Sequence, residues 1–152
     1  MDQLVRFAPF SGIFRGFAAF CRRRRAAIPF AAETASAGFP SPADDYLEEQ
    51  LDLNDLIIED EAATFMVRVR SDSMEPTLFA GDIAVINRAK KATSGCVVLG
   101  LLDGDFTLKR FFHRGRDILL KSDNRAYADI VVTADRGFEV WGVVRRSIRL
   151  FP

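Results

Sequence analysis

From Thr64 onward, hydrophobic and polar residues tend to alternate, as they do in half-buried β-strands. The pattern predicts strands over residues 64–70, 83–86, 97–102, 106–112, 118–121 and 139–148. Asp103-Gly104 lies between two of these segments and is a strong hairpin signal. Several short strands joined by turns, with little helix, are typical of curved sheets and barrels. We therefore expect a mainly β domain that is curved, partly open and barrel-like.

The segment before the predicted strands has a different pattern. Residues 31–38 are mostly small, and residues 39–42 contain two prolines, which favour an extended backbone. This composition suits a linker that a protease can reach. Residues 44–53 combine acids near their start with spaced hydrophobic side chains, which predicts a short helix or turn with Asp44 as N-cap.

The first 27 residues are rich in phenylalanine and arginine. Phe7, Phe10, Phe14 and Phe17 recur at helical spacing, and a block of four arginines follows at 22–25. Because this block follows the hydrophobic stretch, the order differs from that of a signal peptide. Three interpretations are open. We favour a flexible arm that docks on its own domain or on a partner. The segment would otherwise be a basic helix on a membrane surface or the product of a misassigned translation start.

Composition narrows the class of protein. The chain has 152 residues, of which 49% are hydrophobic and 28% charged, as expected for one globular domain with a tail. Lys and Arg number 21, as do Asp and Glu, so the formal net charge is zero, which argues against a dedicated nucleic-acid coat. Residues 1–37 carry a net charge of +4 (six Arg, two acids), and the remaining residues carry −4. We expect no membrane span, because no long hydrophobic run is present.

Cysteine and histidine are scarce. Cys21 and Cys96 are far apart and form no CxxC motif, and His113 is the only histidine. This excludes a disulfide scaffold and disfavours a zinc site. We expect neither a metal nor a cofactor. A Ser-His-Asp triad would have only His113 as its base.

A serine and a lysine are the candidate catalytic residues. Residues 71–78 (Ser-Asp-Ser-Met-Glu-Pro-Thr-Leu) follow a predicted strand, where serines most often serve as turn formers. Lys109 lies in the predicted strand 106–112, where a lysine is most often a solvated edge residue. Alternation places Lys109 on one face with Thr107 and Phe111. A lysine held against hydrophobic side chains has a lowered pKa, and its neutral amine can take a proton from a serine hydroxyl.

These motifs resemble those of a known peptidase family. Ser73-Met74, Gly81-Asp82 and the Thr-Leu-Lys-Arg run at 107–110 are similar, in order and spacing, to the self-cleaving LexA/UmuD serine peptidases. Residues 38–46 resemble UmuD-like members in particular, where such a segment begins just after the cleaved bond. The resemblance covers about 28 to 144.

The resemblance implies a reaction. Ser73 would be the nucleophile, Lys109 the general base and Ala37-Gly38 the scissile pair. Self-cleavage would remove an arm and linker, residues 1–37, from a peptidase domain, residues 38–152. A RecA filament on single-stranded DNA would stimulate the reaction. The product would be a homodimer that serves a UmuC-like Y-family polymerase in cytoplasmic translesion synthesis during the SOS response.

One departure from the family pattern concerns Ser71, which stands where LexA and UmuD have a glycine. Its hydroxyl would either donate to the oxyanion or cap the turn. Residues 71–78 also resemble the serine box of type I signal peptidases, but residues 1–27 do not provide the membrane anchor that such an enzyme needs. A further alternative is a catalytically idle module that binds a polymerase or RecA. The 37 residues before the peptidase domain are too few for a winged helix-turn-helix, so we expect no sequence-specific DNA binding.

Overall fold

The computed structural model of the chain describes residues 27–31, 47–133 and 135–152, with side chains from residue 52 onward. The chain divides into two compact units, with a boundary between Glu59 and Asp60. The described residues of the smaller unit are 27–31 and 47–59. Those of the larger unit lie within 60–152, and all candidate catalytic side chains belong to it.

The smaller unit contains a two-stranded antiparallel pairing and a short helix. Strand β1 (Ala27–Ala31) pairs with β2 (Leu47–Asp52), and helix α1 (Leu53–Ile57) follows directly. Asp52 is the N-cap of this helix, because its carboxylate accepts a 2.9 Å hydrogen bond from the backbone N–H of Asn54.

The predicted helix or turn over 44–53 is therefore wrong for residues 47–52, which form β2. Pairing with β1 satisfies the backbone groups of this segment, and β1 lies too far away along the chain for a local pattern to reveal it. The helix starts only at Leu53, capped by Asp52 rather than by Asp44. Asp44 itself lies outside the described residues.

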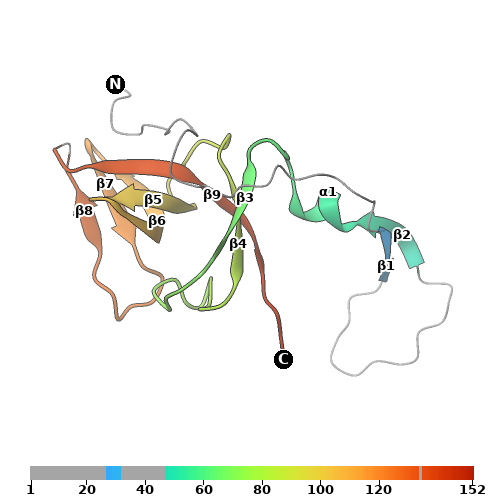
Figure 1. Ribbon diagram of the computed structural model, residues 1–152. Helices are drawn as coiled ribbons and strands as arrows, with labels where there is room; N and C mark the ends of the chain where they lie inside the picture. The colour runs from blue at the N-terminus through green and yellow to red at the C-terminus, as the bar shows by residue number, and fades with distance from the viewer. Residues whose placement is uncertain (1–26, 32–46, 134) are drawn as a thin grey trace. The chain divides into compact units, whose positions relative to one another are not determined.

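The larger unit is built on one antiparallel sheet, which has seven strands over the described residues. The strands are β3 (Thr64–Arg68), β4 (Ile83–Asn87), β5 (Val97–Leu102), β6 (Asp105–Arg114), β7 (Asp117–Lys121), β8 (Ile130–Val132) and β9 (Phe138–Ile148). Their order is β3-β4-β9-β5-β6-β7-β8, so the last strand of the chain lies inside the sheet (Figure 1). Because β3 and β8 are edges that do not pair, the sheet is open. The expected mainly β, partly open architecture is confirmed.

Each of the six predicted segments overlaps a strand of this sheet to within two residues at either end, and the main miss is β8. Its three residues, Ile130–Val132, are too short to show a period of their own, and pairing with β7 makes them a strand. The predicted hairpin is confirmed. Leu102 pairs with Asp105, and the two turn residues have the positive φ angles of a tight hairpin turn, 51° at Asp103 and 95° at Gly104.

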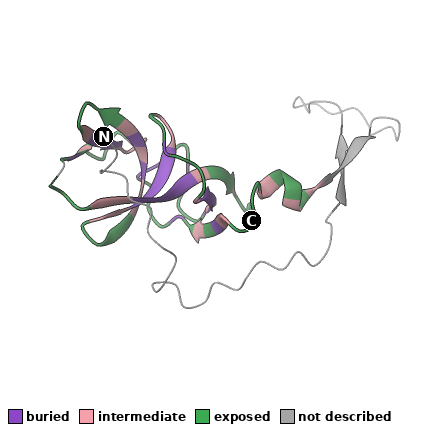
Figure 2. Cartoon of the chain, turned by 90° about the horizontal axis from the view of Figure 1, so that it is seen from above, coloured by how far each residue is buried: buried purple, intermediate pink, exposed green. Residues whose placement is uncertain are grey.

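Two hydrophobic clusters form the core, and Figure 2 shows the buried residues gathered along the strands. Trp141 is only 5% exposed and belongs to the first cluster. Phe111 and Leu120, which are paired across β6 and β7, belong to the second cluster and are fully buried. The side of β6 that carries Phe111 thus faces the interior.

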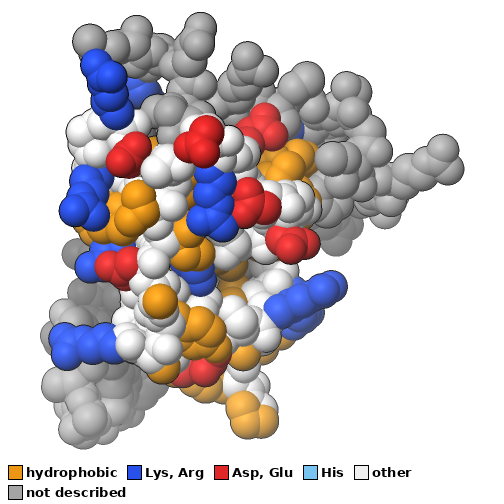
Figure 3. Space-filling model, turned by 90° about the vertical axis from the view of Figure 1, so that its left-hand side faces the viewer, with side chains coloured by type: hydrophobic (Ala, Val, Ile, Leu, Met, Phe, Trp, Pro, Cys, Tyr) orange, Lys and Arg blue, Asp and Glu red, His pale blue; other side chains and the backbone are white. Residues whose placement is uncertain are grey.

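Charged side chains of both signs share the surface. On the face shown in Figure 3, Lys and Arg lie among Asp and Glu, with hydrophobic side chains between them. Neither sign forms a continuous patch on the coloured part of this face. The balance of charges in the sequence is thus also a local balance on this side of the molecule.

Candidate active site

The serine segment is a compact turn held by the core. It follows β3, and Val69 closes it by accepting from the N–H of Gly81 (2.9 Å) and donating to the carbonyl of Asp82 (2.8 Å). Met74 and Leu78 are 1% and 2% exposed and pack in the first hydrophobic cluster, which attaches the turn to the core. Ser73, next to Met74, is buried with it. The backbone of the nucleophile candidate is therefore rigidly placed.

Lys109 reaches this serine from the middle of β6. Strand alternation directs its side chain to the same face as Phe111, as the sequence predicted, and Lys109 is only 8% exposed. Its Nζ atom donates a 3.1 Å hydrogen bond to the Oγ atom of Ser73, which is 5% exposed. The structure thus brings together the two residues that were predicted to form a dyad.

The surroundings of Lys109 favour the neutral amine. Burial lowers the pKa of the Lys109 ammonium below its ordinary value. The ring of Tyr127 lies over the amine, with 5.8 Å between Nζ and the ring centroid, a contact that by itself favours the ammonium. Desolvation is the dominant effect, because the net direction of the pKa shift is downward. A lysine in this state is suited to accept a proton.

Ser71 lies beside the nucleophile candidate. Its Oγ atom is 3.1 Å from that of Ser73, and either hydroxyl can donate in this pair. When Ser73 donates its proton toward a neutral Lys109, the hydroxyl of Ser71 has to be the donor to Ser73. This contact with a side chain, two residues along, is not the backbone cap that a simple turn former makes.

A second segment, residues 122–128 after β7, contacts the serine turn. Asn124 donates from its backbone N–H to the carbonyl of Ser73 (3.1 Å) and from Nδ2 to the carbonyl of Asp72 (3.2 Å). The hydroxyl of Tyr127 donates to the carboxylate of Asp72, which also raises the pKa of the tyrosine. Sequence reasoning missed this segment. The only available signal was Ser-Asp-Asn after a strand, which indicates a turn without indicating its neighbour.

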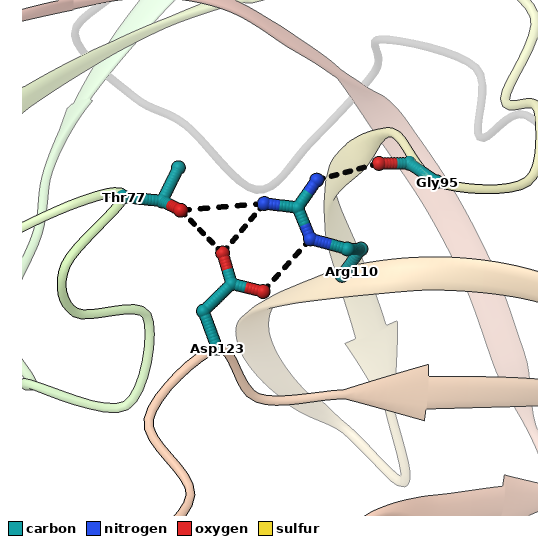
Figure 4. A network of polar contacts seen from close by, with 4 residues as sticks. All are labelled: Thr77, Gly95, Arg110 and Asp123. Carbon is teal, nitrogen blue, oxygen red and sulfur yellow. Dashed lines mark hydrogen bonds and ion pairs between the residues drawn. The ribbon is translucent and has the colours of Figure 1, made fainter.

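A polar network lies next to this contact (Figure 4). The guanidinium of Arg110 donates from Nε and Nη2 to the two carboxylate oxygens of Asp123, at 2.8 and 2.5 Å, and from Nη1 to the carbonyl of Gly95, at 2.6 Å. Thr77 contributes its hydroxyl, which donates to Asp123 (2.5 Å) and accepts from Nη2 of Arg110 (3.3 Å). The hydrogen bond to Arg110 is the main cause that lowers the pKa of Asp123.

Other candidate residues have ordinary environments. His113 is exposed at the end of β6, and Cys96 is half-buried against the second hydrophobic cluster. Over the described part of the chain, His, Cys, Asp and Glu form no group of three that could hold a metal ion. In the same part, no helix is long and apolar enough to cross a membrane. Ala37 and Gly38 lie outside the described residues.

Comparison with known proteins identifies the family. The Peptidase S24-like family matches residues 29–145 of the chain. The chain belongs to this family. Proteins that are similar to it include Protein SamA of Salmonella typhimurium, 43% identical over 121 residues, which cover 79% of this chain and 84% of SamA. Protein MucA of Escherichia coli is 33% identical over 126 residues, which cover 82% of this chain and 86% of MucA.

LexA repressor 2 of Pseudomonas syringae pv. tomato is 39% identical over 86 residues, or 56% of this chain and 43% of the repressor. The resemblance to a UmuD-like member of the LexA/UmuD peptidases is therefore confirmed. The chain is a serine peptidase by family, and its relatives support a UmuD-like accessory function in SOS mutagenesis.

Proposed function

We propose that this Peptidase S24-like chain cleaves its own Ala37–Gly38 bond, with Ser73 as the nucleophile and Lys109 as the general base. The observation that carries the proposal is the 3.1 Å hydrogen bond between the Lys109 amine and the Ser73 hydroxyl inside the fold. Burial of both groups supports it, because burial lowers the pKa of Lys109 and so raises the fraction of neutral amine that can act as a base.

The reaction follows from this pair. Lys109 takes the hydroxyl proton of Ser73 while the Oγ atom attacks the carbonyl carbon of Ala37. The backbone N–H of Ser73 stabilises the oxyanion, and the Ser71 hydroxyl, 3.1 Å from that of Ser73, donates a hydrogen bond to the attacking oxygen. The Lys109 ammonium then gives its proton to the departing amine of Gly38. Water, deprotonated by the same lysine, hydrolyses the ester and regenerates Ser73.

The substrate is part of the same polypeptide. Small residues around Ala37 and Gly38 let the backbone approach a buried serine, and the tether keeps the bond at a high effective concentration. Cleavage divides the chain into the arm, residues 1–37, and the peptidase domain, residues 38–152. The domain loses a net charge of +4 with the arm, which changes the surface offered to a partner.

We place this reaction in the SOS response. A RecA filament on single-stranded DNA stimulates cleavage, and the product, a homodimer, serves as accessory subunit of a UmuC-like Y-family polymerase. The chain acts in the cytoplasm and does not bind DNA sequence-specifically. Membership in the Peptidase S24-like family and similarity to SamA and MucA support this role.

Incubation of the purified full chain at mildly alkaline pH tests the proposal. We expect a 115-residue fragment that begins at Gly38, identified by its mass and N-terminal sequence. Ser73→Ala and Lys109→Ala should each abolish cleavage while the far-UV circular dichroism spectrum stays unchanged. Lys121→Ala is the matched control, because Lys121 lies on the neighbouring strand and pairs with Asp129 at 3.3 Å.

Three results would contradict the proposal. An intact full chain, with or without a RecA filament on single-stranded DNA, would indicate an idle binding module. Cleavage of an added secretory precursor, with the chain itself uncut, would indicate a signal-peptidase type of reaction. Cleavage at an unchanged rate after either dyad substitution would remove that residue from the mechanism.

A further inference from the structure

Arg110 connects the serine turn, the segment after β7 and the loop before β5. We call Arg110, Thr77, Asp123 and the carbonyl of Gly95 the Arg110 brace (Figure 4). Thr77 belongs to the serine turn, Asp123 to the segment after β7, and Gly95 to the loop before β5. Each of the three guanidinium nitrogens makes a hydrogen bond within the brace, so one planar group sets the spacing of all three loops.

Residues of the brace lie close in the chain to both members of the dyad. Arg110 follows Lys109 in β6 and points to the opposite face, so it does not compete for the serine hydroxyl. Thr77 lies in the turn that carries Ser73. Asp123 precedes Asn124, whose backbone N–H donates to the carbonyl of Ser73 at 3.1 Å. A displacement of Asp123 would therefore pass directly to the backbone of Ser73.

The brace also differs from the surface ion pairs of the same molecule. The side chains of Arg110 and Asp123 are 29% and 14% exposed, whereas those of Arg136 and Asp103 are 39% and 51% exposed. Charge-assisted bonds that are partly shielded from water are stronger and better defined in geometry than exposed ones. In agreement, Arg110 holds the pKa of Asp123 below its ordinary value, so the carboxylate stays ionised.

We propose that Arg110 is a positioning residue, which holds the serine turn and the 122–128 segment at the spacing that aligns Ser73 with Lys109. The inference rests on the proposed self-cleavage but concerns a residue outside the dyad. Arg110 acts through Thr77 and through the Asp123–Asn124 link, and it touches none of the reacting atoms.

Arg110→Gln tests this role, with Arg136→Gln as the matched control, because Arg136 makes two hydrogen bonds to Asp103 in the same way. We expect Arg110→Gln to slow self-cleavage about 10- to 100-fold, since a misplacement of ~1 Å can cost that much. Arg136→Gln should cleave at the wild-type rate. Rates are compared well below the unfolding temperature of each variant, so that only folded molecules contribute.

Amide hydrogen exchange provides the readout that a merely stabilising role would not change. In Arg110→Gln, the Asn124 amide should exchange faster, while the amides of the central strands β4 and β9 keep their protection. Arg110→Lys retains the positive charge but loses the planar guanidinium with its several donors. We expect this variant to cleave itself as slowly as Arg110→Gln. If Arg110→Gln does not fold, Thr77→Val removes one arm of the brace and should give a smaller slowing.

Several results would overturn the inference. They are wild-type cleavage rates in Arg110→Gln, full activity in Arg110→Lys, or slow cleavage with unchanged exchange at Asn124. A wild-type chain that does not cleave at all would instead refute the proposed function. In that case the exchange of Asn124 in Arg110→Gln still decides whether the brace holds the serine turn.

Discussion

The Nζ atom of Lys109 lies 3.1 Å from the Oγ atom of Ser73, although 36 positions separate the two residues in the chain. The lysine comes from the middle of a ten-residue strand, and the serine comes from a turn anchored in the core. A strand therefore holds one end of the hydrogen bond and a turn packed in the core holds the other, so the contact can persist without a substrate. This relationship leads to the first two predictions.

The rate of self-cleavage should rise with pH and level off below pH 10.5, the ordinary pKa of lysine. Burial lowers the pKa of Lys109, so the neutral fraction that can act as a base reaches one half at a lower pH than for a free lysine. Single-turnover rates between pH 6 and pH 11 measure this midpoint. A rate that is independent of pH over this range would exclude a lysine base.

Lys109→Met should raise stability while it abolishes cleavage. The folded state holds fewer protons on Lys109 than the unfolded state does, so burial of the lysine costs stability at neutral pH, and this cost disappears as the pH rises through 10.5. We expect the free energy of unfolding to increase by about 1 kcal/mol at pH 7. Urea unfolding at pH 7 and pH 10 measures the difference, which should be smaller at pH 10. A variant less stable than wild type at pH 7 would contradict this view.

Asp82 should make the fold sensitive to acid. Asp82 is 2% exposed, and Arg149 donates to both of its carboxylate oxygens, at 2.8 and 2.7 Å. The hydrogen bonds from Arg149, aided by one from the backbone N–H of Phe79, lower the pKa of Asp82 from 3.8 to about 2. A depressed carboxylate pKa stabilises the fold above the unfolded value, so this contribution should be lost as the pH falls from about 4 to about 2.

Asp82→Asn measures this contribution. We expect it to lower the free energy of unfolding at pH 7 by about 2 kcal/mol, because the hydrogen bonds of Arg149 lose their charged acceptor. The variant should also lose less stability than wild type between pH 4 and pH 2. Asp105→Asn, at an exposed position, is the control. If Asp82→Asn and wild type lost the same stability between pH 4 and pH 2, groups other than Asp82 would cause the acid sensitivity.

Gly142 should not tolerate a side chain. A Cβ atom at this position of β9 would lie 2.6 Å from Cγ2 of Ile86 and 3.0 Å from the backbone oxygen of Asn87. Gly142→Ala should therefore destabilise the fold by about 1–3 kcal/mol, as overpacking of a core does. Gly137→Ala is the matched control, because its Cβ would meet nothing within 4 Å. Thermal unfolding of the two variants compares them, and equal melting temperatures would contradict the prediction.

The candidate dyad could be predicted from the sequence because each of its residues lies in a short motif, and the order and spacing of these motifs resemble a known family. Alternation along 106–112 placed Lys109 on the face of Phe111, and both are buried. Asp103-Gly104 predicted a hairpin because these residue types tolerate the positive φ angles of a tight turn, and both residues have positive φ angles in the structure. The order of the motifs around Ser73 and Lys109 also indicated the family, and the match over residues 29–145 confirmed it.

Other features depend on partners that are distant in the chain. Residues 47–52 became a strand because β1 pairs with them, and Ile130–Val132 became one because β7 does. The Arg110 brace joins positions 77, 95, 110 and 123, and no local pattern shows that these meet.

The sequence by itself determined the strand pattern, the hairpin, the family and the pair of residues proposed to react. Side-chain period and turn chemistry depend on neighbouring positions, and the order of the motifs can be read along the chain without knowing the fold. Only the tertiary structure decided the 3.1 Å approach of Lys109 to Ser73, the burial that lowers the lysine's pKa, and the contacts of Asn124 and Asp123 around them. Distances between side chains and their exposure to water depend on how the whole sheet folds, and no short segment specifies that.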